Sequence, residues 1–298
     1  MIKYRLDPAI IREFRNYMKD KGYTQEAVKS YGNSIRNYLA VNPGANNYEY
    51  RDVLSSLEQK ACRPLTISAR KTILIYIKKY YDFLLDTGRR DDHPCRQLNL
   101  RGKIDKAVIH SDLFNMAELE LTFNREGKFK KLIPRNRAIL SLLIYQAMTV
   151  SEIVRLKISD IDMDAGIIKI TGGQLLTNRQ LEIKPKQYGI LHNYINNGRK
   201  KLLKCKTDCF SLGLTGMPDK VDNPRTLVES LKPLYPGRNL NPRSIRDSVI
   251  SYWLNECKIP LEQVQLMAGH RWISCTERYF QVSMEEQKEI LKKFHPLG

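Results

Sequence analysis

The stretch that decides the fold reads NPRSIR at residues 241–246, and it is followed by MAGH at residues 267–270 and ERY at residues 277–279. Pro242 suits the first turn of a helix, where its fixed φ is helical and its missing N–H would have no partner. We therefore expect a helix from 242 to about 257, and the short motifs that follow it predict further helix ends and turns.

Two arginines lie close to the start of this helix. Arg243 and Arg246 are three residues apart, so we expect both guanidinium groups to leave the same helical face. The helix macrodipole repels cations at this end, so an anion must offset the repulsion. A phosphate would do so, and so would the carboxylate of Asp247 through an ordinary ion pair; the sequence leaves both interpretations open.

The charge balance indicates a polyanionic partner. The chain has 298 residues, with 50 Lys and Arg against 32 Asp and Glu, for a net charge of +18. Residues 1–110 hold 21 basic and 12 acidic residues, so each part of the chain carries an excess of nine positive charges. Nucleic acid is the most common partner of such a protein, although solubility charge or an anionic lipid surface would also fit.

Several other classes of protein are disfavoured. The sequence has no apolar run of about 20 residues that could span a membrane and no signal peptide at Met1, so we expect a cytoplasmic protein without a membrane partner. The six cysteines lack paired CxxC spacing, which predicts reduced thiols rather than a zinc site. Neither a carboxylate cluster for Mg²⁺ nor a phosphate-binding glycine loop is visible, so we expect neither a metal nor a cofactor.

Helical periodicity dominates the first hundred residues. We expect helices at 8–21, from Thr24 to about 40, at 49–60 and at 65–87. Arg70, Lys71 and Lys78 project from the last of these helices and are candidates for DNA binding, although a solvated helix face is an equally good explanation. The polar stretch from Gly88 to about His110 predicts a connection, in which we place the linker itself at 105–111.

The remainder is also mainly helical, with one small sheet. We expect helices near 112–124, 133–147, 151–156, 186–203, 224–233, 242–257, 260–268 and 284–294, and strands at 167–171 and 180–184 joined by a turn containing Gly172 and Gly173. The predicted fold class is mainly α with a small β-hairpin or sheet, in other words an α+β second domain.

These motifs, taken in order, resemble the tyrosine recombinases, a family that includes Xer recombinases and phage and transposon integrases. The resemblance spans nearly the whole chain: the helices from Thr24 to Leu39, the stretch from Pro64 to Pro94, the run VSEIVRLK at 150–157, the motifs at 241–279 and the closing KKFHP at 292–296. Five matches in the correct order form a specific signal.

The resemblance implies roles for individual residues. Tyr279 would attack the scissile phosphate of double-stranded DNA and form a 3′-phosphotyrosine, so that religation needs neither ATP nor metal. Arg246 matches the family's second catalytic arginine, and His270 its hydrogen-bonding or acid–base histidine. Arg179 matches the family's hairpin arginine and is a candidate for DNA binding. We expect the Tyr279 hydroxyl to face a cationic groove that it shares with Arg246 and His270.

Three positions depart from the family pattern. Thr149 stands where the family has its first arginine, Gln174 where it has the hairpin lysine, and Arg243 where it has a histidine. Some mobile-element integrases also lack the first arginine, and the chain resembles them in this respect. Lys169 or Lys184 could replace the lysine only if the hairpin turn folds differently. We expect these losses to weaken catalysis.

The resemblance also predicts the domain organisation. Residues 1–104 would form a helical core-binding domain, and residues 112–298 a catalytic domain, so that the two close on DNA as a clamp. Residues 284–298 would form an exchange helix that docks on a neighbouring subunit and builds a tetramer on DNA, although it could instead cap its own domain. The chain is either an active recombinase or integrase, or an impaired relative that occupies or bridges DNA sites.

Overall fold

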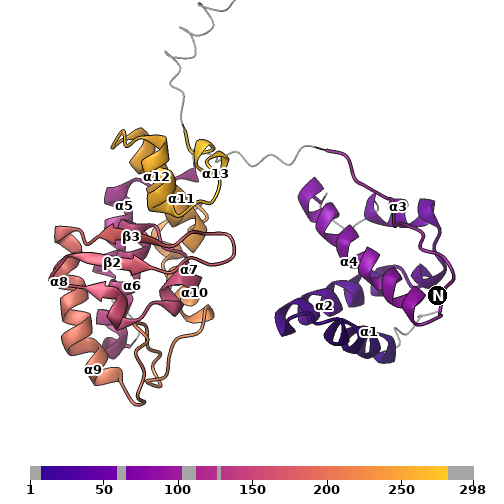
Figure 1. Cartoon of the computed structure of the whole chain (residues 1–298), viewed down its shortest axis with the longest axis horizontal. Helices are drawn as coiled ribbons and strands as arrows, with labels where there is room; N and C mark the ends of the chain where they lie inside the picture. The colour runs from indigo at the N-terminus through magenta and orange to yellow at the C-terminus, as the bar shows by residue number, and fades with distance from the viewer. Residues whose placement is uncertain (1–7, 59–64, 103–111, 126–128, 281–298) are drawn as a thin grey trace, which may run out of the picture. The chain divides into compact units, whose positions relative to one another are not determined.

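A computed structural model describes residues 8–58, 65–102, 112–125 and 129–280. The chain forms two compact units, residues 1–105 and residues 106–298, each with its own hydrophobic core (Figure 1). Among the described residues, no helix is long and apolar enough to cross a membrane. The predicted linker at 105–111 and the predicted exchange helix at 284–298 lie outside the described residues.

The first unit is helical, as the periodicity predicts. Its α-helices are α1 (Pro8–Asp20), α2 (Gln25–Val41), α3 (Tyr50–Glu58) and α4 (Ile67–Asp86), with a 3₁₀ turn at Ala45–Asn47. Threonine side chains cap the two longest helices: Thr24 accepts from the backbone N–H of Ala27, and Thr66 from that of Ala69. Such caps satisfy N–H groups that have no partner within the helix.

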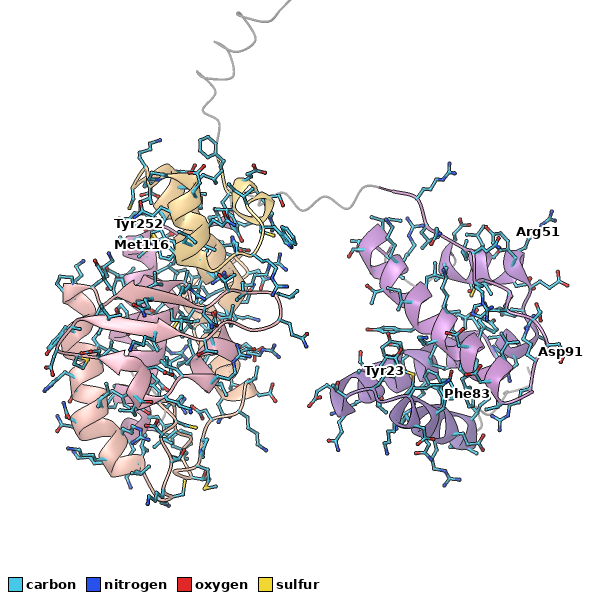
Figure 2. All side chains as sticks on the ribbon, in the orientation of Figure 1. Tyr23, Arg51, Phe83, Asp91, Met116 and Tyr252 are labelled. Atoms are coloured by element: carbon cyan, nitrogen blue, oxygen red, sulfur yellow. The ribbon has the colours of Figure 1, made fainter. Side chains whose placement is uncertain are left out.

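Aromatic side chains fill the core of this unit. The Phe14 ring of α1 packs edge-on against Tyr80 and Phe83 of α4, with centroids 5.7 and 5.6 Å apart. Figure 2 labels Phe83 among the side chains of this unit. The hydroxyl of Tyr81 donates to the carbonyl of Ala45 at 2.6 Å. Each aromatic ring buries a large apolar area, and the hydroxyl keeps a hydrogen-bond partner.

The segment after α4 differs from the prediction. The stretch from Gly88 onward looks like a connection, but Cys95 and Leu98 are buried in the core of the first unit. The ring of His93 also forms a hydrogen bond with the backbone carbonyl of Lys78 at 3.1 Å. The segment is mainly polar, so the burial of Cys95 and Leu98 could not be predicted from its composition. It belongs to the first unit at least as far as Leu100, which still packs against the core.

The second unit has more elements. Its α-helices are α5 (Met116–Glu120), α6 (Ile133–Gln146), α7 (Val150–Arg155), α8 (Pro185–Asn193), α9 (Arg199–Leu202), α10 (Asp222–Glu229), α11 (Pro242–Asn255), α12 (Leu261–Ala268) and α13 (Ser274–Glu277). Its strands are β1 (Ile161–Asp162), β2 (Ile167–Ile170) and β3 (Arg179–Glu182). The predicted class, mainly helical with a small sheet, is confirmed.

Helix α6 and the sheet form the framework of this unit. Nine of the 14 residues of α6 are buried, and it packs against α8 and α11 (Figure 1). The sheet is antiparallel in the order β1-β2-β3, with Ile168 opposite both Ile161 and Leu181. This framework places the loop between β2 and β3 next to the residues that follow α12, because Leu176 pairs with His270 in an isolated bridge.

Two helices of the second unit differ from their predicted course or bounds. The helix expected at 186–203 is interrupted by a π-helical turn at Tyr194–Gly198. Tyr194 is buried there, and its hydroxyl donates to the carbonyl of Phe210 at 2.8 Å. A Cβ on Gly198 would lie 2.7 Å from the Pro134 side chain, so packing against α6 requires glycine. The helix expected at 112–124 begins only at Met116, because Asn115 caps it.

Candidate functional site

The first element of the site is the start of α11. The Asn241 side chain accepts hydrogen bonds from the backbone N–H groups of Arg243 and Ser244, both at 3.0 Å. In return, the Ser244 hydroxyl oxygen accepts from the backbone N–H of Asn241 at 2.9 Å. This reciprocal cap fixes where the helix begins, and therefore fixes the directions in which Arg243, Arg246 and Asp247 leave it.

Arg246 is held in the interior of the second unit. Its side chain donates from Nη1 to the carbonyl of Ala147 and from Nη2 to the carbonyl of Ala268, the latter at 2.6 Å. These carbonyls belong to the ends of α6 and α12, where the helix dipole is negative. Arg246 is only 7 % exposed, and burial lowers the pKa of its guanidinium. The site thus contains a fixed cation in a poorly solvated place.

A second buried arginine lies close by. Arg179 of β3 pairs with Glu152 of α7, with Nη1 2.5 Å from one carboxylate oxygen and Nη2 3.3 Å from the other. Burial alone would raise the pKa of Glu152, but Arg179, the backbone N–H of Thr149 and the charge of Arg246 together hold this pKa below its ordinary value. The positive charge of Arg179 also acts on Arg246. Two arginines therefore share one carboxylate, which leaves an excess of positive charge.

Glycine at position 269 lets these groups approach one another. Gly269 ends α12 with φ of 70°, a conformation that favours glycine. A Cβ at this position would lie 2.7 Å from Nη1 of Arg179 and 3.1 Å from the carbonyl oxygen of Thr177. The Gly-His pair of the sequence thus has a structural reason, since glycine brings the hairpin loop and His270 together.

His270 is fixed from both sides. Its Nδ1 forms a hydrogen bond with the hydroxyl of Thr276 at 2.9 Å, and its backbone N–H donates to the carbonyl of Gln265 at 3.0 Å. Burial lowers the pKa of His270 to about 4, and the positive charges of Arg246, Arg278 and Arg179 act in the same direction. The imidazole is therefore neutral at neutral pH and can accept or donate a hydrogen bond through its other nitrogen.

Tyr279 follows the short helix α13 and lies against His270. The two rings stack with centroids 6.1 Å apart and planes 12° apart. Burial and the neighbouring Asp247 both raise the pKa of Tyr279, which is 4 % exposed. Its hydroxyl donates to Oδ1 of Asp247 at 2.6 Å. A buried phenol needs an acceptor, and this carboxylate supplies it. The expectation that the hydroxyl faces a cationic groove shared with Arg246 and His270 stays a prediction.

Arg243 and Arg246 have different surroundings, contrary to the expectation of one shared face. The Arg243 side chain is 75 % exposed, whereas Arg246 points into the interior. Arg243 pairs with Asp247, with its Nε 3.5 Å from Oδ2. The ion pair between Arg243 and Asp247, one of the two interpretations that the sequence allowed, is therefore present. Asp247 binds Arg243 with one oxygen and Tyr279 with the other.

The three departures from the family pattern are also visible. Thr149 caps α7: its hydroxyl accepts from the backbone N–H of Glu152 at 3.3 Å and lies 2.9 Å from the Glu152 carboxylate. Gln174 is exposed in the loop between β2 and β3, and Lys169 and Lys184 are exposed on β2 and just before α8. Both lysines are exposed, one on a strand and one at the start of a helix. Their positions therefore do not identify either of them as the general acid that the family's hairpin lysine would supply.

The cations predicted to bind DNA in the first unit contact its own backbone. Lys71 donates to the carbonyl of Gly102 at 3.0 Å, and Lys78 to the carbonyl of Arg96 at 2.9 Å. Arg70 is partly buried next to them in sequence. Their role in DNA binding stays a prediction. Arg179, by contrast, belongs to the buried cluster of the second unit.

Glu152 and Thr276 also belong to the site, although the sequence did not predict them as members. Glu152 lies in the Ser-Glu motif that carries the family resemblance, and its distance from Arg179 in the sequence hid their pairing. Thr276 lies between His270 and Tyr279 in the sequence, but an isolated threonine carries no sequence signal. Asp247 was considered only as the partner of Arg243.

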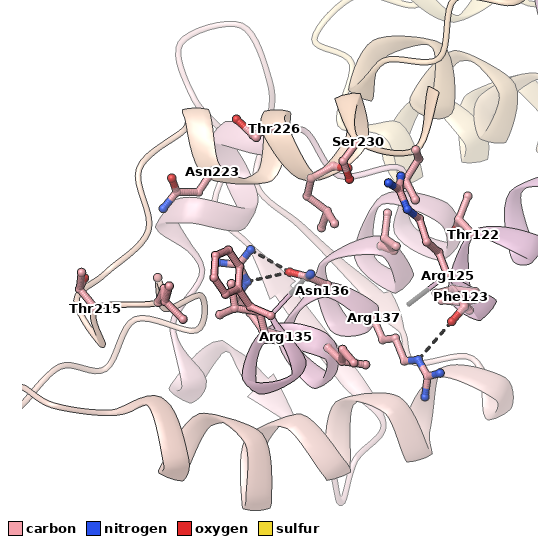
Figure 3. A pocket seen from close by; sticks show the side chains of 18 residues that line it. Thr122, Phe123, Arg125, Arg135, Asn136, Arg137, Thr215, Asn223, Thr226 and Ser230 are labelled. Carbon is pink, nitrogen blue, oxygen red and sulfur yellow. Dashed lines mark hydrogen bonds between the residues drawn. The ribbon is translucent and has the colours of Figure 1, made fainter. Parts of the chain in front are cut away.

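The cluster differs from a ligand pocket or a metal centre. A cavity of about 570 Å³ lies elsewhere in the second unit, where Arg137 donates to the carbonyl of Phe123 and Arg135 to the side chain of Asn136 (Figure 3). None of Arg246, His270 and Tyr279 lines it. Across the parts of the chain that the structure describes, no three His, Cys, Asp or Glu residues are grouped to hold a metal ion.

The sequence of this chain is similar to those of known recombinases. The model of the phage integrase family matches residues 118–286. The tyrosine recombinase XerD of Staphylococcus haemolyticus is 31 % identical over 96 % of this chain and 98 % of its own length. XerD of Halalkalibacterium halodurans is 24 % identical over 96 % of this chain and 97 % of its own.

Solved structures show the same fold. The XerH recombinase bound to its difH substrate is 15 % identical, with a TM-score of 0.67 over 96 % of this chain and 94 % of that one. The Tn1549 transposon integrase bound to transposon right-end DNA is 14 % identical, with a TM-score of 0.66 over 96 % and 99 %. With more than half of its length matched by the family model, this chain belongs to the phage integrase family of tyrosine recombinases.

Proposed function

We propose that this chain is a site-specific recombinase that cleaves and rejoins double-stranded DNA through a 3′-phosphotyrosine intermediate on Tyr279. The observation that carries the proposal is the grouping of Arg246, His270 and Tyr279. The histidine and tyrosine rings stack 6.1 Å apart, and the Arg246 charge acts on both side chains. This is a nucleophile beside a neutral imidazole and a fixed cation, which together fit phosphoryl transfer.

The proposed reaction exchanges one phosphate ester for another. The Tyr279 oxygen attacks the phosphorus and loses its proton; the bond to the 5′-oxygen breaks, and that oxygen takes up a proton. The products are a 3′-phosphotyrosine and a free 5′-hydroxyl. Attack by a 5′-hydroxyl on the phosphotyrosine reverses these steps, so the covalent bond conserves the ester for religation.

Each side chain would have a distinct part in this reaction. Arg246, already fixed by two carbonyls, would stabilise the charge that develops on the non-bridging oxygens, because preorganised donors need no reorganisation during the reaction. His270 would use its second ring nitrogen as a hydrogen-bond or acid–base group. Arg179 would add positive charge behind Arg246. The exposed Arg243 would contact the phosphate from the solvent side.

Double-stranded DNA is the proposed partner of both units. The net charge of +18 is distributed over the two parts of the chain, which suits two basic bodies that close on one duplex as a clamp. Residues 1–104 would be the core-binding domain, with Arg70, Lys71 and Lys78 on phosphates, and residues 112–298 the catalytic domain. Assembly into a tetramer through residues 284–298 completes the proposal.

One set of observations favours a second candidate, a DNA-binding relative with impaired chemistry. Thr149 is an uncharged helix cap where the family has an arginine, and Gln174 is an exposed loop residue where it has a lysine. The Tyr279 hydroxyl is also bound to a carboxylate. Such a protein would occupy or bridge DNA sites without strand exchange.

A nicked duplex that carries the protein's own site separates the two candidates, because cleavage near the nick releases a short strand and traps the covalent product. We expect a protein–DNA adduct that is stable in denaturant and disappears in Tyr279→Phe. Tyr188→Phe is the matched control, since Tyr188 also stacks on a histidine, His192, with centroids 6.2 Å and planes 12° apart. Tight binding without an adduct would favour the impaired relative.

A further inference from the structure

We propose that Asp247 is a positioning residue that occupies the place of the scissile phosphate in the free protein and must release Tyr279 and Arg243 when DNA binds. The inference rests on the proposed function, since it concerns how the same site begins its reaction. The hydrogen bond to Asp247 would keep the Tyr279 hydroxyl from attacking, and an incoming phosphate must displace the negative charge of this carboxylate.

The geometry around Asp247 supports this inference. Oδ1 accepts the hydrogen bond from the Tyr279 hydroxyl at 2.6 Å, and Oδ2 lies 3.5 Å from Nε of Arg243. The Asp247 side chain is 17 % exposed, so it stands at the boundary between the buried cluster and solvent. The two groups proposed to contact the phosphate, a phenol and an exposed guanidinium, thus both bind one carboxylate.

A carboxylate can take the place of a phosphate because both present oxygen acceptors with negative charge to guanidinium and hydroxyl donors. The surroundings are strongly cationic: Arg243 and Arg246 lie on α11, Arg179 on β3 and Arg278 beside Tyr279, with the neutral His270 stacked on the tyrosine ring. Asp247 is therefore the anion at the mouth of a cationic cluster. A phosphate cannot approach Tyr279 while this carboxylate keeps its contacts, because like charges repel.

The short hydrogen bond would also fit a different role, in which Asp247 takes the proton from Tyr279 as a general base. Two features favour the blocking role. A carboxyl group ordinarily binds a proton far less tightly than a phenolate does, so it is a weak base toward tyrosine. In addition, a base that also pairs with Arg243 would hold that arginine away from the phosphate. The experiment separates the two roles.

The test compares Asp247→Asn with the unchanged full-length protein in two measurements. Asparagine keeps the size of the side chain and an oxygen that accepts from Tyr279, but removes the charge. We expect it to tighten binding to an intact duplex carrying the site about tenfold. On the nicked duplex at saturating protein, we expect faster adduct formation and an onset of cleavage at lower pH, because phenol ionisation no longer opposes a neighbouring negative charge.

Two further variants make the test specific. Asp222→Asn is the matched control: Asp222 is an exposed aspartate that pairs with Arg225 at 3.9 Å on α10, so it loses the same charge but faces no phenol. In an Arg243→Gln background, the gain in affinity from Asp247→Asn should shrink, since the released arginine supplies part of it. Asp222→Asn should reproduce neither the tighter binding nor the faster cleavage.

The outcomes are distinguishable. Slower cleavage in Asp247→Asn, restored in Asp247→Glu, would identify a general base and overturn the inference, as would unchanged or weaker DNA binding. If no variant forms an adduct, the proposed function fails, yet tighter binding that depends on Arg243 would still support Asp247 as the anion that phosphate displaces.

Discussion

Burial separates the three arginines of the site more clearly than sequence position does. Arg243 is exposed and pairs with a carboxylate, whereas Arg246 and Arg179 are buried and fixed by carbonyls or by Glu152. A buried guanidinium that is already oriented loses little conformational freedom when it binds a phosphate. An exposed guanidinium must first lose its bound water and its ion pair. The buried pair is therefore suited to stabilise charge, and the exposed arginine to respond to DNA.

His270 should make the stability of the second unit depend on pH. Its pKa is about 4 in the folded chain, against an ordinary 6.5. Between these values the unfolded chain binds a proton that the folded chain excludes, so the free energy of unfolding is fully present above pH 6.5 and falls as the pH drops toward 4. We expect a loss of about 2 kcal/mol between pH 7 and pH 5.

Urea unfolding at both pH values measures this effect through tryptophan fluorescence. Both tryptophans of the chain, Trp253 and Trp272, lie in the second unit, and Trp253 is buried. In His270→Gln the difference in the free energy of unfolding between pH 7 and pH 5 should shrink by about 2 kcal/mol. His192→Gln, on the exposed side of α8, should leave this difference unchanged. An undiminished difference in His270→Gln would show that another group is responsible.

The uncharged side chain of Thr149 leads to a prediction about rate. Thr149→Arg should increase adduct formation on the nicked duplex, because it returns a cation to the position where the family has its first arginine. The change also removes the hydroxyl that caps α7, which costs about 1 kcal/mol of stability. Thr149→Ser, which keeps the cap without adding charge, is the control, and an unchanged rate in the arginine variant would count against matching this position to the family's arginine.

At the scale of elements, local signals predicted most helices, and long-range contacts explain what they missed. The start of α11 follows from Asn241 and Pro242, whose capping chemistry lies within four residues. The bounds of the hairpin were also nearly right, since alternation is local. Strand β1 has only two residues, and α13 only four, so neither carries a period long enough to detect.

The site itself could be predicted only in part. Arg246, His270 and Tyr279 follow from the resemblance to a family, because their spacing is distinctive. Their surroundings did not follow, since a carbonyl 99 residues away binds Arg246 and a carboxylate 32 residues away binds Tyr279. Such partners depend on how helices pack, which the sequence pattern of a single helix does not record.

The cap of α11 gives a prediction at this scale. Asn241→Ala removes the acceptor of two backbone N–H groups, so it should lower the free energy of unfolding of the second unit by about 1 kcal/mol. It should also slow cleavage, because the first turn of α11 sets the directions of Arg243 and Arg246. Asn197→Ala is the control, since Asn197 is exposed and bonds to the Asn193 side chain one helical turn away. Equal stability of both variants in urea would refute the role of the cap.

At the scale of the whole molecule, the two units have separate cores but share the charge excess. The first unit holds its core with aromatic rings on α1 and α4, and the second with the apolar helix α6. Residues 1–110 and residues 111–298 each contribute nine positive charges to the total of +18. If both units bind phosphates, the affinity for DNA must depend on salt more steeply than either unit alone would allow.

The cations of α4 test the contribution of the first unit. Lys71 and Lys78 are seven residues apart, so they lie on one face of the helix, and both now donate to backbone carbonyls. A phosphate is a stronger acceptor than a neutral carbonyl, so DNA should draw these ammonium groups away. Replacing Arg70, Lys71 and Lys78 with glutamine should therefore weaken binding at low salt. It should also reduce the slope of log affinity against log salt by about 0.9 for each phosphate that these cations neutralise in the unchanged protein.

Fluorescence anisotropy with a labelled duplex over a series of salt concentrations measures that slope. A triple variant at Arg12, Lys19 and Arg51, exposed cations on α1 and α3, removes the same charge from the same unit. A general effect of net charge would lower affinity equally in both triple variants, because long-range attraction depends on the total. Direct contacts would lower the slope only in the α4 variant, since counterions are released where an ammonium group meets a phosphate. Equal slopes in the two variants would therefore place the DNA-binding surface of the first unit somewhere other than α4.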